Sequence, residues 1–125
     1  MQFSLDHVSL RVSNLEATAR FYMEVLGLEE IENGTGTEGI RWFGISGKES
    51  VHISRGDLAT TRVTKSNHLA LRTPDLDMTM AELTARNVRF FDWAGEEGRP
   101  TLRPDGVRQI YIQDPDGYWI EINDN

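Results

Sequence analysis

The sequence predicts an α+β fold of two tandem βαβββ modules, and three observations support it. Residues 7–18 recur at 68–79, with identical residues at five of the twelve compared positions, so the chain holds an internal repeat. Each copy opens on alternating polar and apolar residues, as a strand with one buried face does. A helical stripe of apolar residues and then three strand-like segments follow in each copy.

The first copy, at about residues 3–54, supplies the elements of the first module. Alternation over residues 3–12 predicts a strand, and apolar residues at helical spacing after Ser13 or Asn14 predict a helix. Gly27 is placed to end that helix, because glycine readily adopts the left-handed conformation found there. Three further strands are predicted at 28–31, 40–46 and 50–54, with a hairpin turn at Gly47-Lys48 between the last two.

The second copy, at about residues 67–125, follows a polar linker at 55–66. A strand is predicted at 67–73 and a helix start at Thr73-Pro74-Asp75, with the proline in the first turn and Asn87 at the helix end. The remaining elements are strands at 88–93, 107–113 and 118–123, a loop at 94–106 and a turn at Asp114–Gly117. A loop of that length inside a compact domain is often functional.

The length and the composition bound the classes of protein to which the chain can belong. One domain over residues 1–125 is expected, because two repeats of about 60 residues would be marginal alone. The formal net charge of −7 opposes binding to nucleic acid, and the lack of cysteine excludes disulfides and thiolate metal sites. No run of 18 apolar residues and no signal-peptide pattern is present, so we expect a cytoplasmic protein without a membrane partner.

Four residues carry the candidate chemistry, and each lies on the first or last strand of a copy: His7, His52, His68 and Glu121. Alternation places each of them on the face opposite the apolar residues, which must cover the helix. The other, concave face of each sheet is then free for a ligand. Two such sheets facing each other would bring three imidazoles and one carboxylate together in a metal cup. This donor set suits one divalent ion per site, Zn²⁺, Ni²⁺, Co²⁺, Mn²⁺ or Fe²⁺.

Structural roles for the same residues compete with this interpretation. A single histidine on a strand is more often a hydrogen-bonded, partly buried residue than a metal ligand. Glu121 stands between two isoleucines and must face water or a partner, because burying an unpaired carboxylate is costly. Arg11 and Arg72 could be solvated or ion-paired, although Arg11 is also a candidate substrate-binding residue. The recurrence of histidine at equivalent strand positions favours the metal site.

The chain resembles the vicinal oxygen chelate (glyoxalase/bleomycin resistance/dioxygenase) superfamily and, within it, the glyoxalase I (lactoylglutathione lyase) family. Residues 7–12, 14–16 and 21–28 resemble the opening of that family, and 114–121 resembles its end. The resemblance implies a metal ion at the four positions and a small-molecule substrate that chelates it through two vicinal oxygens. It also implies a homodimer, commonly with each site assembled from the first copy of one subunit and the second copy of the other.

Two departures from glyoxalase I bear on the chemistry. Bacterial members have glutamate where this chain has His52, so the metal centre here would carry a charge of about +1 rather than 0 and its bound water would be more acidic. Glu121 is then the only carboxylate in the set and the expected catalytic residue for moving a proton. Gly56 stands where glutathione-using members tend to have asparagine, whereas Arg11 matches a glutathione-contacting position.

The resemblance implies a metal-dependent lyase or isomerase that moves a proton next to a metal-chelated carbonyl, on a substrate such as a glutathione adduct. An epimerase of the methylmalonyl-CoA type is an alternative, because it resembles this chain in having a neutral ligand at the His52 position. A small extradiol-type dioxygenase would use His7, His68 and Glu121 on Fe²⁺. A non-catalytic drug-resistance binding protein is the alternative of another class, although such binders generally lack the ligand set.

Overall fold

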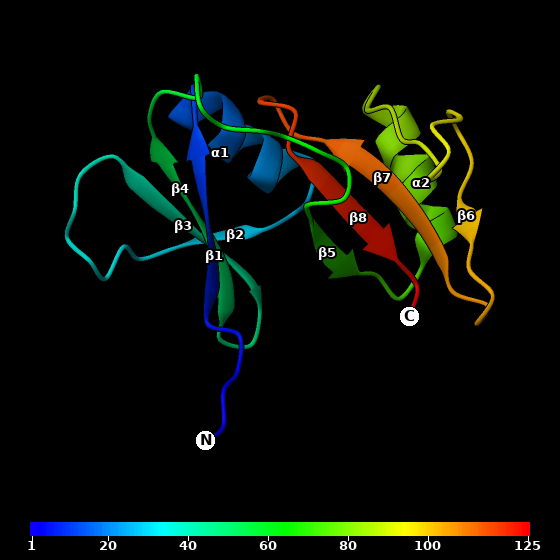
Figure 1. The fold of residues 1–125 in the computed structure, drawn as a ribbon, viewed down its shortest axis with the longest axis horizontal. Helices are drawn as coiled ribbons and strands as arrows, with labels where there is room; N and C mark the ends of the chain where they lie inside the picture. Colours follow the sequence, from blue (N-terminus) through cyan, green and yellow to red (C-terminus); the bar gives the residue numbers. More distant parts are fainter. The chain divides into compact units, whose positions relative to one another are not determined.

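The computed structural model describes all 125 residues, and the chain divides into two compact units, Met1–Thr61 and Arg62–Asn125. Each unit contains one helix and one four-stranded sheet (Figure 1). The boundary between the units falls inside the predicted linker at 55–66. The α+β class and the two βαβββ modules are therefore confirmed, and the single-domain assignment over residues 1–125 stays a prediction.

The first unit has a mixed sheet in the order β1-β4-β3-β2, in which β1 is parallel to β4 and the other pairs are antiparallel. The register places Ser9 and Trp42 on either side of His52. Neighbouring side chains on one face of a sheet lie close enough to interact, so this register gathers rings around His52. The elements of the unit are β1 (His7–Val12), α1 (Leu15–Glu24), β2 (Glu29–Ile31), β3 (Ile40–Ser46) and β4 (Glu49–Arg55).

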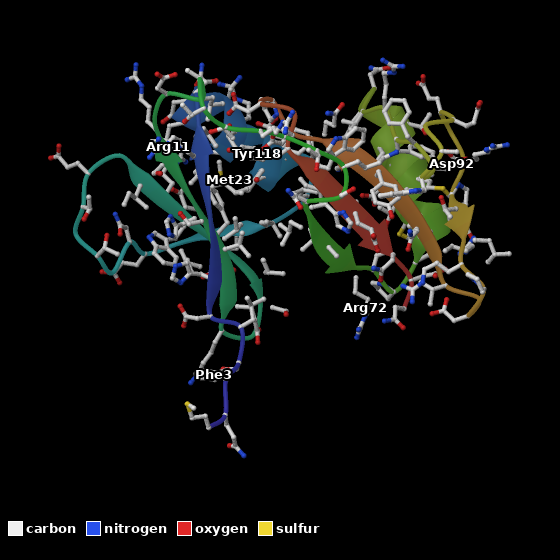
Figure 2. All side chains as sticks on the ribbon, in the orientation of Figure 1. Phe3, Arg11, Met23, Arg72, Asp92 and Tyr118 are labelled. Atoms are coloured by element: carbon white, nitrogen blue, oxygen red, sulfur yellow. The ribbon has the colours of Figure 1, made fainter.

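The first strand is shorter than its alternating sequence predicts, because it begins at His7 rather than at residue 3. Nearest the amino terminus, the backbone hydrogen bond between this part of the chain and β4 runs from the Ser50 amide to the Asp6 carbonyl, at 3.2 Å. Since β4 begins at Glu49, residues before Asp6 have no partner strand. Figure 2 shows Phe3 on this amino-terminal segment, where its side chain is 90% exposed.

The helix α1 covers one face of the first sheet. Asn14 is its N-cap, since the Asn14 Oδ1 accepts a hydrogen bond from the Ala17 amide at 3.0 Å. The helix packs on β3 and β4, and Tyr22 meets the ring of Phe43 with 5.7 Å between centroids. Gly27 follows the helix with a φ of +66°, as predicted for its end. The core of the unit lies between helix and sheet, at Val12, Thr18, Ala19, Tyr22, Phe43, Val51 and Ile53.

The second unit repeats this topology in the order β5-β8-β7-β6, with β5 parallel to β8. Glu121 on β8 lies between Ala70 of β5 and Tyr111 of β7. The predicted turn at Asp114–Gly117 joins β7 to β8, and the Gly117 amide donates to the Asp114 carbonyl at 2.9 Å. The elements are β5 (His68–Arg72), α2 (Leu76–Ala85), β6 (Thr101–Leu102), β7 (Arg108–Gln113) and β8 (Trp119–Asn123).

The helix α2 begins two residues later than the Thr73-Pro74-Asp75 motif suggests. The Asp75 Oδ1 accepts from the Met78 amide at 2.8 Å, so Asp75 is the N-cap and Pro74 lies before it rather than in the first turn. Asn87 ends the helix as predicted, with a φ of +56° in the left-handed region. Neither α1 nor α2 is long and apolar enough to cross a membrane.

The predicted strand at 88–93 is wrong. Phe91 alone bridges to β7, by a pair of 2.9 Å backbone hydrogen bonds with Tyr111. The carbonyl oxygens of Asp92 and Trp93 accept from the Lys65 ammonium. The amides of the same two residues donate to the Glu96 carbonyl and the Thr101 hydroxyl, so these groups form no ladder with β7. The fourth strand of the sheet is instead the short β6, which comes from inside the predicted loop at 94–106.

Candidate metal centre

In the first unit, His7 and His52 lie together on the sheet face that α1 does not cover. Their ring centroids are 5.0 Å apart. Trp42 packs against both rings, with its centroid 4.4 Å from that of His52 and 5.0 Å from that of His7. Alternation along β4 accounts for this placement, because Val51 and Ile53 are fully buried beneath the opposite face.

Two of the three histidines have the Nδ1 nitrogen hydrogen-bonded to an acceptor. The His7 Nδ1 lies 2.6 Å from the Asp6 carboxylate, and the His68 Nδ1 lies 2.7 Å from the carbonyl oxygen of Lys65. An acceptor at Nδ1 holds the proton there, so Nε2 is left to bind a metal ion. Metal-ligating histidines commonly have such a partner.

The third histidine, His52, has no protein partner for its Nδ1. That nitrogen is fully buried and forms no hydrogen bond, and the same holds for the Trp42 Nε1 beside it. Burial lowers the pKa of His52, and the nearby His7 lowers it further, so the neutral ring is favoured. A neutral imidazole is the form that binds a metal ion, and a buried nitrogen without a partner fits a side chain whose partner is a bound ligand.

In the second unit, the His68 Nε2 lies 3.1 Å from the Glu121 Oε2. Two ligand atoms bound about 2.1 Å from one ion, at the angles of tetrahedral or octahedral coordination, are separated by roughly 3.0–3.4 Å. The observed separation therefore fits two ligands of one divalent ion. The same separation also suits a hydrogen bond between the two side chains.

The Glu121 carboxylate is buried, with 7% of the residue exposed, and both of its oxygens are held. Its Oε1 accepts from the Asn123 side-chain amide at 2.8 Å, and its Oε2 accepts from the Tyr111 hydroxyl at 2.9 Å. Burial raises the pKa of Tyr111, and its bond to Glu121 raises it further, so the phenol stays protonated as a donor. Gln109 donates in turn to the Tyr111 hydroxyl. These bonds offset the cost of burying the carboxylate.

The structure brings the predicted ligands together in pairs, one in each unit. His7 meets His52 in the first unit, and His68 meets Glu121 in the second. No group of three or more histidine, aspartate or glutamate side chains is arranged to hold a metal ion. The four-ligand centre therefore stays a prediction, now supported by two pairs that have the chemistry of half-sites.

Arg11 lies directly over Gly56. A Cβ atom at position 56 would come within 2.6 Å of the Arg11 Cδ and 2.9 Å of its Cγ. A larger residue at that position would therefore displace the arginine, so the glycine and the arginine form one structural feature of the first unit. Figure 2 shows Arg11 toward one end of β1 and Arg72 on β5 of the second unit. Substrate binding by Arg11 stays a prediction.

Sequence reasoning missed several residues that hold the ligands. Tyr111 and Asn123 share a sheet face with Glu121, and the period-two pattern around Glu121 could have identified both. Asp6 directly precedes His7 in the sequence, which is a weak signal. Lys65 stands in the predicted linker, and nothing in the local sequence marks its role.

Comparison with known proteins agrees with the fold. Two tandem βαβββ units are the architecture of the vicinal-oxygen-chelate superfamily. A profile of the Glyoxalase/Bleomycin resistance protein/Dioxygenase superfamily matches residues 4–122, and the chain belongs to this superfamily. It is 32% identical over 124 residues to YwbC, an uncharacterised protein of Bacillus subtilis (strain 168), with 94% of each chain covered.

Solved structures share the fold over almost the whole chain. A structure from Bacillus anthracis described as a glyoxalase family protein is 26% identical, covers 100% of this chain and 97% of its own, and has a TM-score of 0.80. The lactoylglutathione lyase of Agrobacterium tumefaciens is 20% identical, with 98% and 93% covered and a TM-score of 0.72. The oxidase ChaP-H1 is 23% identical, with 99% and 97% covered and a TM-score of 0.80. The fold is thus common to proteins named for different activities.

Proposed function

We propose that this chain is a metal-dependent lyase or isomerase of the glyoxalase I type, which moves a proton next to a metal-chelated carbonyl. The observation that carries the proposal is the contact between the His68 Nε2 and the Glu121 Oε2, at 3.1 Å. The carboxylate of that contact is buried and oriented by Tyr111 and Asn123. A buried carboxylate fixed beside a metal-ligating imidazole has the placement of a general base.

The proposed metal ligands are His7, His52, His68 and Glu121, with one divalent ion per site chosen from Zn²⁺, Ni²⁺, Co²⁺, Mn²⁺ and Fe²⁺. When bound, the ion would polarise a substrate carbonyl and stabilise the negative charge that develops when a neighbouring carbon loses its proton. Three neutral imidazoles and one carboxylate leave the centre with a charge of about +1, which strengthens this effect.

Glu121 takes the proton in the proposed reaction. It removes the proton from the carbon beside the carbonyl and returns it to the carbonyl carbon, so no oxidant or second reactant is consumed. Tyr111 and Asn123 keep the carboxylate in one orientation through both transfers. Arg11 is the proposed contact for an anionic part of the substrate, such as the carboxylates of a glutathione adduct.

The direct test is turnover of the hemithioacetal formed by methylglyoxal and glutathione. Metal-free protein loaded in turn with Ni²⁺, Zn²⁺, Co²⁺, Mn²⁺ and Fe²⁺ is expected to convert it with at least one ion, and untreated metal-free protein is expected to be inactive. Metal analysis of each sample, with about one ion bound per chain, is the control. Absence of turnover with every bound ion would contradict the glyoxalase I assignment, and oxygen uptake with Fe²⁺ and a catechol would favour the dioxygenase alternative.

We also propose a homodimer in which His7 and His52 of one subunit complete a site with His68 and Glu121 of the other. A mixture of His7→Ala and Glu121→Ala subunits tests this arrangement, since each mixed dimer would hold one intact site and one doubly altered site. Random assortment should recover about a quarter of the wild-type metal content and activity. Sites built within single chains would recover neither, because every site would then carry one substitution.

A further inference from the structure

Three aromatic rings of the second unit enclose the ammonium group of Lys65. Its Nζ lies 4.8 to 5.6 Å from three ring centroids, those of Trp93, Tyr111 and Trp119. The same nitrogen donates to the carbonyl oxygens of Asp92, at 2.8 Å, and Trp93, at 3.0 Å. Cation–π attraction and two hydrogen bonds to carbonyls hold this side chain in a single position.

The backbone of the same lysine meets the proposed metal ligand. The Lys65 carbonyl oxygen lies 2.7 Å from the His68 Nδ1, and the opposite ring nitrogen, Nε2, faces Glu121. The carbonyl can hold the proton on Nδ1 only if it stays in place. Residues 62–67 belong to no helix or strand, so the caged side chain, rather than a ladder, fixes this carbonyl.

The ring of Tyr111 joins the two features. It is one wall of the Lys65 cage, it packs edge-on against His68 with 5.6 Å between centroids, and its hydroxyl donates to Glu121. Loss of the lysine cation would therefore release both the carbonyl that orients His68 and one contact of the ring that orients Glu121.

We propose that Lys65 is a positioning residue for the metal-binding pair of the second unit. Its caged ammonium anchors the linker so that its carbonyl keeps the proton of His68 on Nδ1 and directs Nε2 toward the metal ion. The inference rests on the proposed function for its effect on metal binding. The effect of Lys65 on the His68 ring proton can be measured without metal. An experiment can therefore contradict the positioning role of Lys65 without contradicting the proposed function, and the reverse.

A simple electrostatic role for Lys65 makes the opposite prediction. A positive charge near a divalent ion weakens its binding, so removal of that charge alone would tighten metal binding. Removal of an anchor would weaken it, because loss of a group that orients a ligating histidine costs about 10–100-fold in metal affinity. The sign of the change therefore distinguishes the two roles.

The test uses Lys65→Met, which keeps the length of the side chain and removes the cation, with Lys48→Met as the matched control. Lys48 is the other lysine of the chain and is exposed in the β3–β4 turn. In metal-free protein, NMR should show the His68 Nδ1 proton protected from exchange in the wild type and in Lys48→Met. In Lys65→Met that proton should exchange at least about tenfold faster, and the affinity for Zn²⁺ or Ni²⁺ should fall about tenfold.

Two further variants guard against a general loss of structure. Lys65→Arg keeps a cation that aromatic rings accept, so it should restore the protected proton and most of the metal affinity. Trp93→Leu removes one wall of the cage at a residue that is 48% exposed, and should give an intermediate exchange rate. An unchanged His68 proton in Lys65→Met, or a tighter metal complex, would overturn the inference. A wild type that binds no metal yet shows the expected proton exchange would overturn only the proposed function.

Discussion

Replacement of Glu121 by glutamine is expected to lower kcat about 1,000-fold, because general acid–base groups contribute roughly 10²–10⁴ in rate. Glutamine keeps the shape of the side chain but cannot take a proton from carbon. The loss corresponds to about 4 kcal/mol of transition-state stabilisation. The change also replaces the only carboxylate of the proposed ligand set, so metal affinity should fall as well.

The measurement must separate these two effects of Glu121→Gln. Kinetics are therefore recorded at metal concentrations that saturate the variant, with bound metal quantified in the same samples. Glu38→Gln is the matched control, since Glu38 is exposed in the segment between β2 and β3 and should leave kcat unchanged. Turnover by Glu121→Gln within tenfold of the wild type, at full occupancy, would remove Glu121 from the role of base.

Denaturant unfolding of the same variant reports on the local bonds. In Glu121→Gln one side-chain oxygen is replaced by an amide nitrogen, so the donors on Tyr111 and Asn123 can no longer both be accepted. A buried donor left without a partner costs about 1–3 kcal/mol, which is large enough to measure. This loss of stability does not change kcat, because the penalty is the same in the free enzyme and in the enzyme with substrate bound.

The sequence predicted most of the fold because local and global signals agree in this chain. The repeat starting at His7 and His68 marked two equivalent units, and the strand patterns placed β3, β4, β5, β7 and β8 close to their observed bounds. Asn14, Gly27 and Asn87 have the capping roles expected of their residue types. When local preferences agree with the global fold in this way, the secondary structure can be predicted from the local sequence.

The failure at residues 88–93 has a long-range cause. A side chain from the linker, Lys65, takes the carbonyls of Asp92 and Trp93, and the Thr101 hydroxyl accepts from the Trp93 amide at 2.6 Å. The strand position next to β7 is then filled by a later segment, β6. No pattern of residues near Trp93 reports the position of a lysine 28 residues earlier in the chain.

The candidate site could be predicted as far as it depends on the alternation of side chains along each β-strand. Strand alternation placed His7, His52, His68 and Glu121 on the helix-free faces, and the structure pairs them as His7–His52 and His68–Glu121. The groups that orient these side chains depend on register and on tertiary contacts. Tyr111 faces Glu121 only because β7 and β8 pair in one register, which the hairpin turn sets.

The second large effect concerns His52, where this chain departs from the glyoxalase I pattern. His52→Ala is expected to weaken the binding of Ni²⁺ or Zn²⁺ at least about 100-fold, or about 2.7 kcal/mol, since removal of a ligand should exceed the loss of a group that only orients one. Competition with a chelating indicator measures the affinity. Ser54→Ala is the matched control, because Ser54 lies two residues along the same strand face and is half-buried like His52.

His52→Glu then separates coordination from packing. A carboxylate at this position should restore metal binding and lower the charge of the centre from about +1 to 0, so the bound water should become less acidic. His52→Gln should not restore the affinity, although glutamine also fills the space beside Trp42. If His52→Ala binds metal as tightly as the wild type, His52 is not a ligand and the set reduces to His7, His68 and Glu121. That outcome would favour the two-histidine, one-carboxylate chemistry of Fe²⁺ oxygenases over proton transfer.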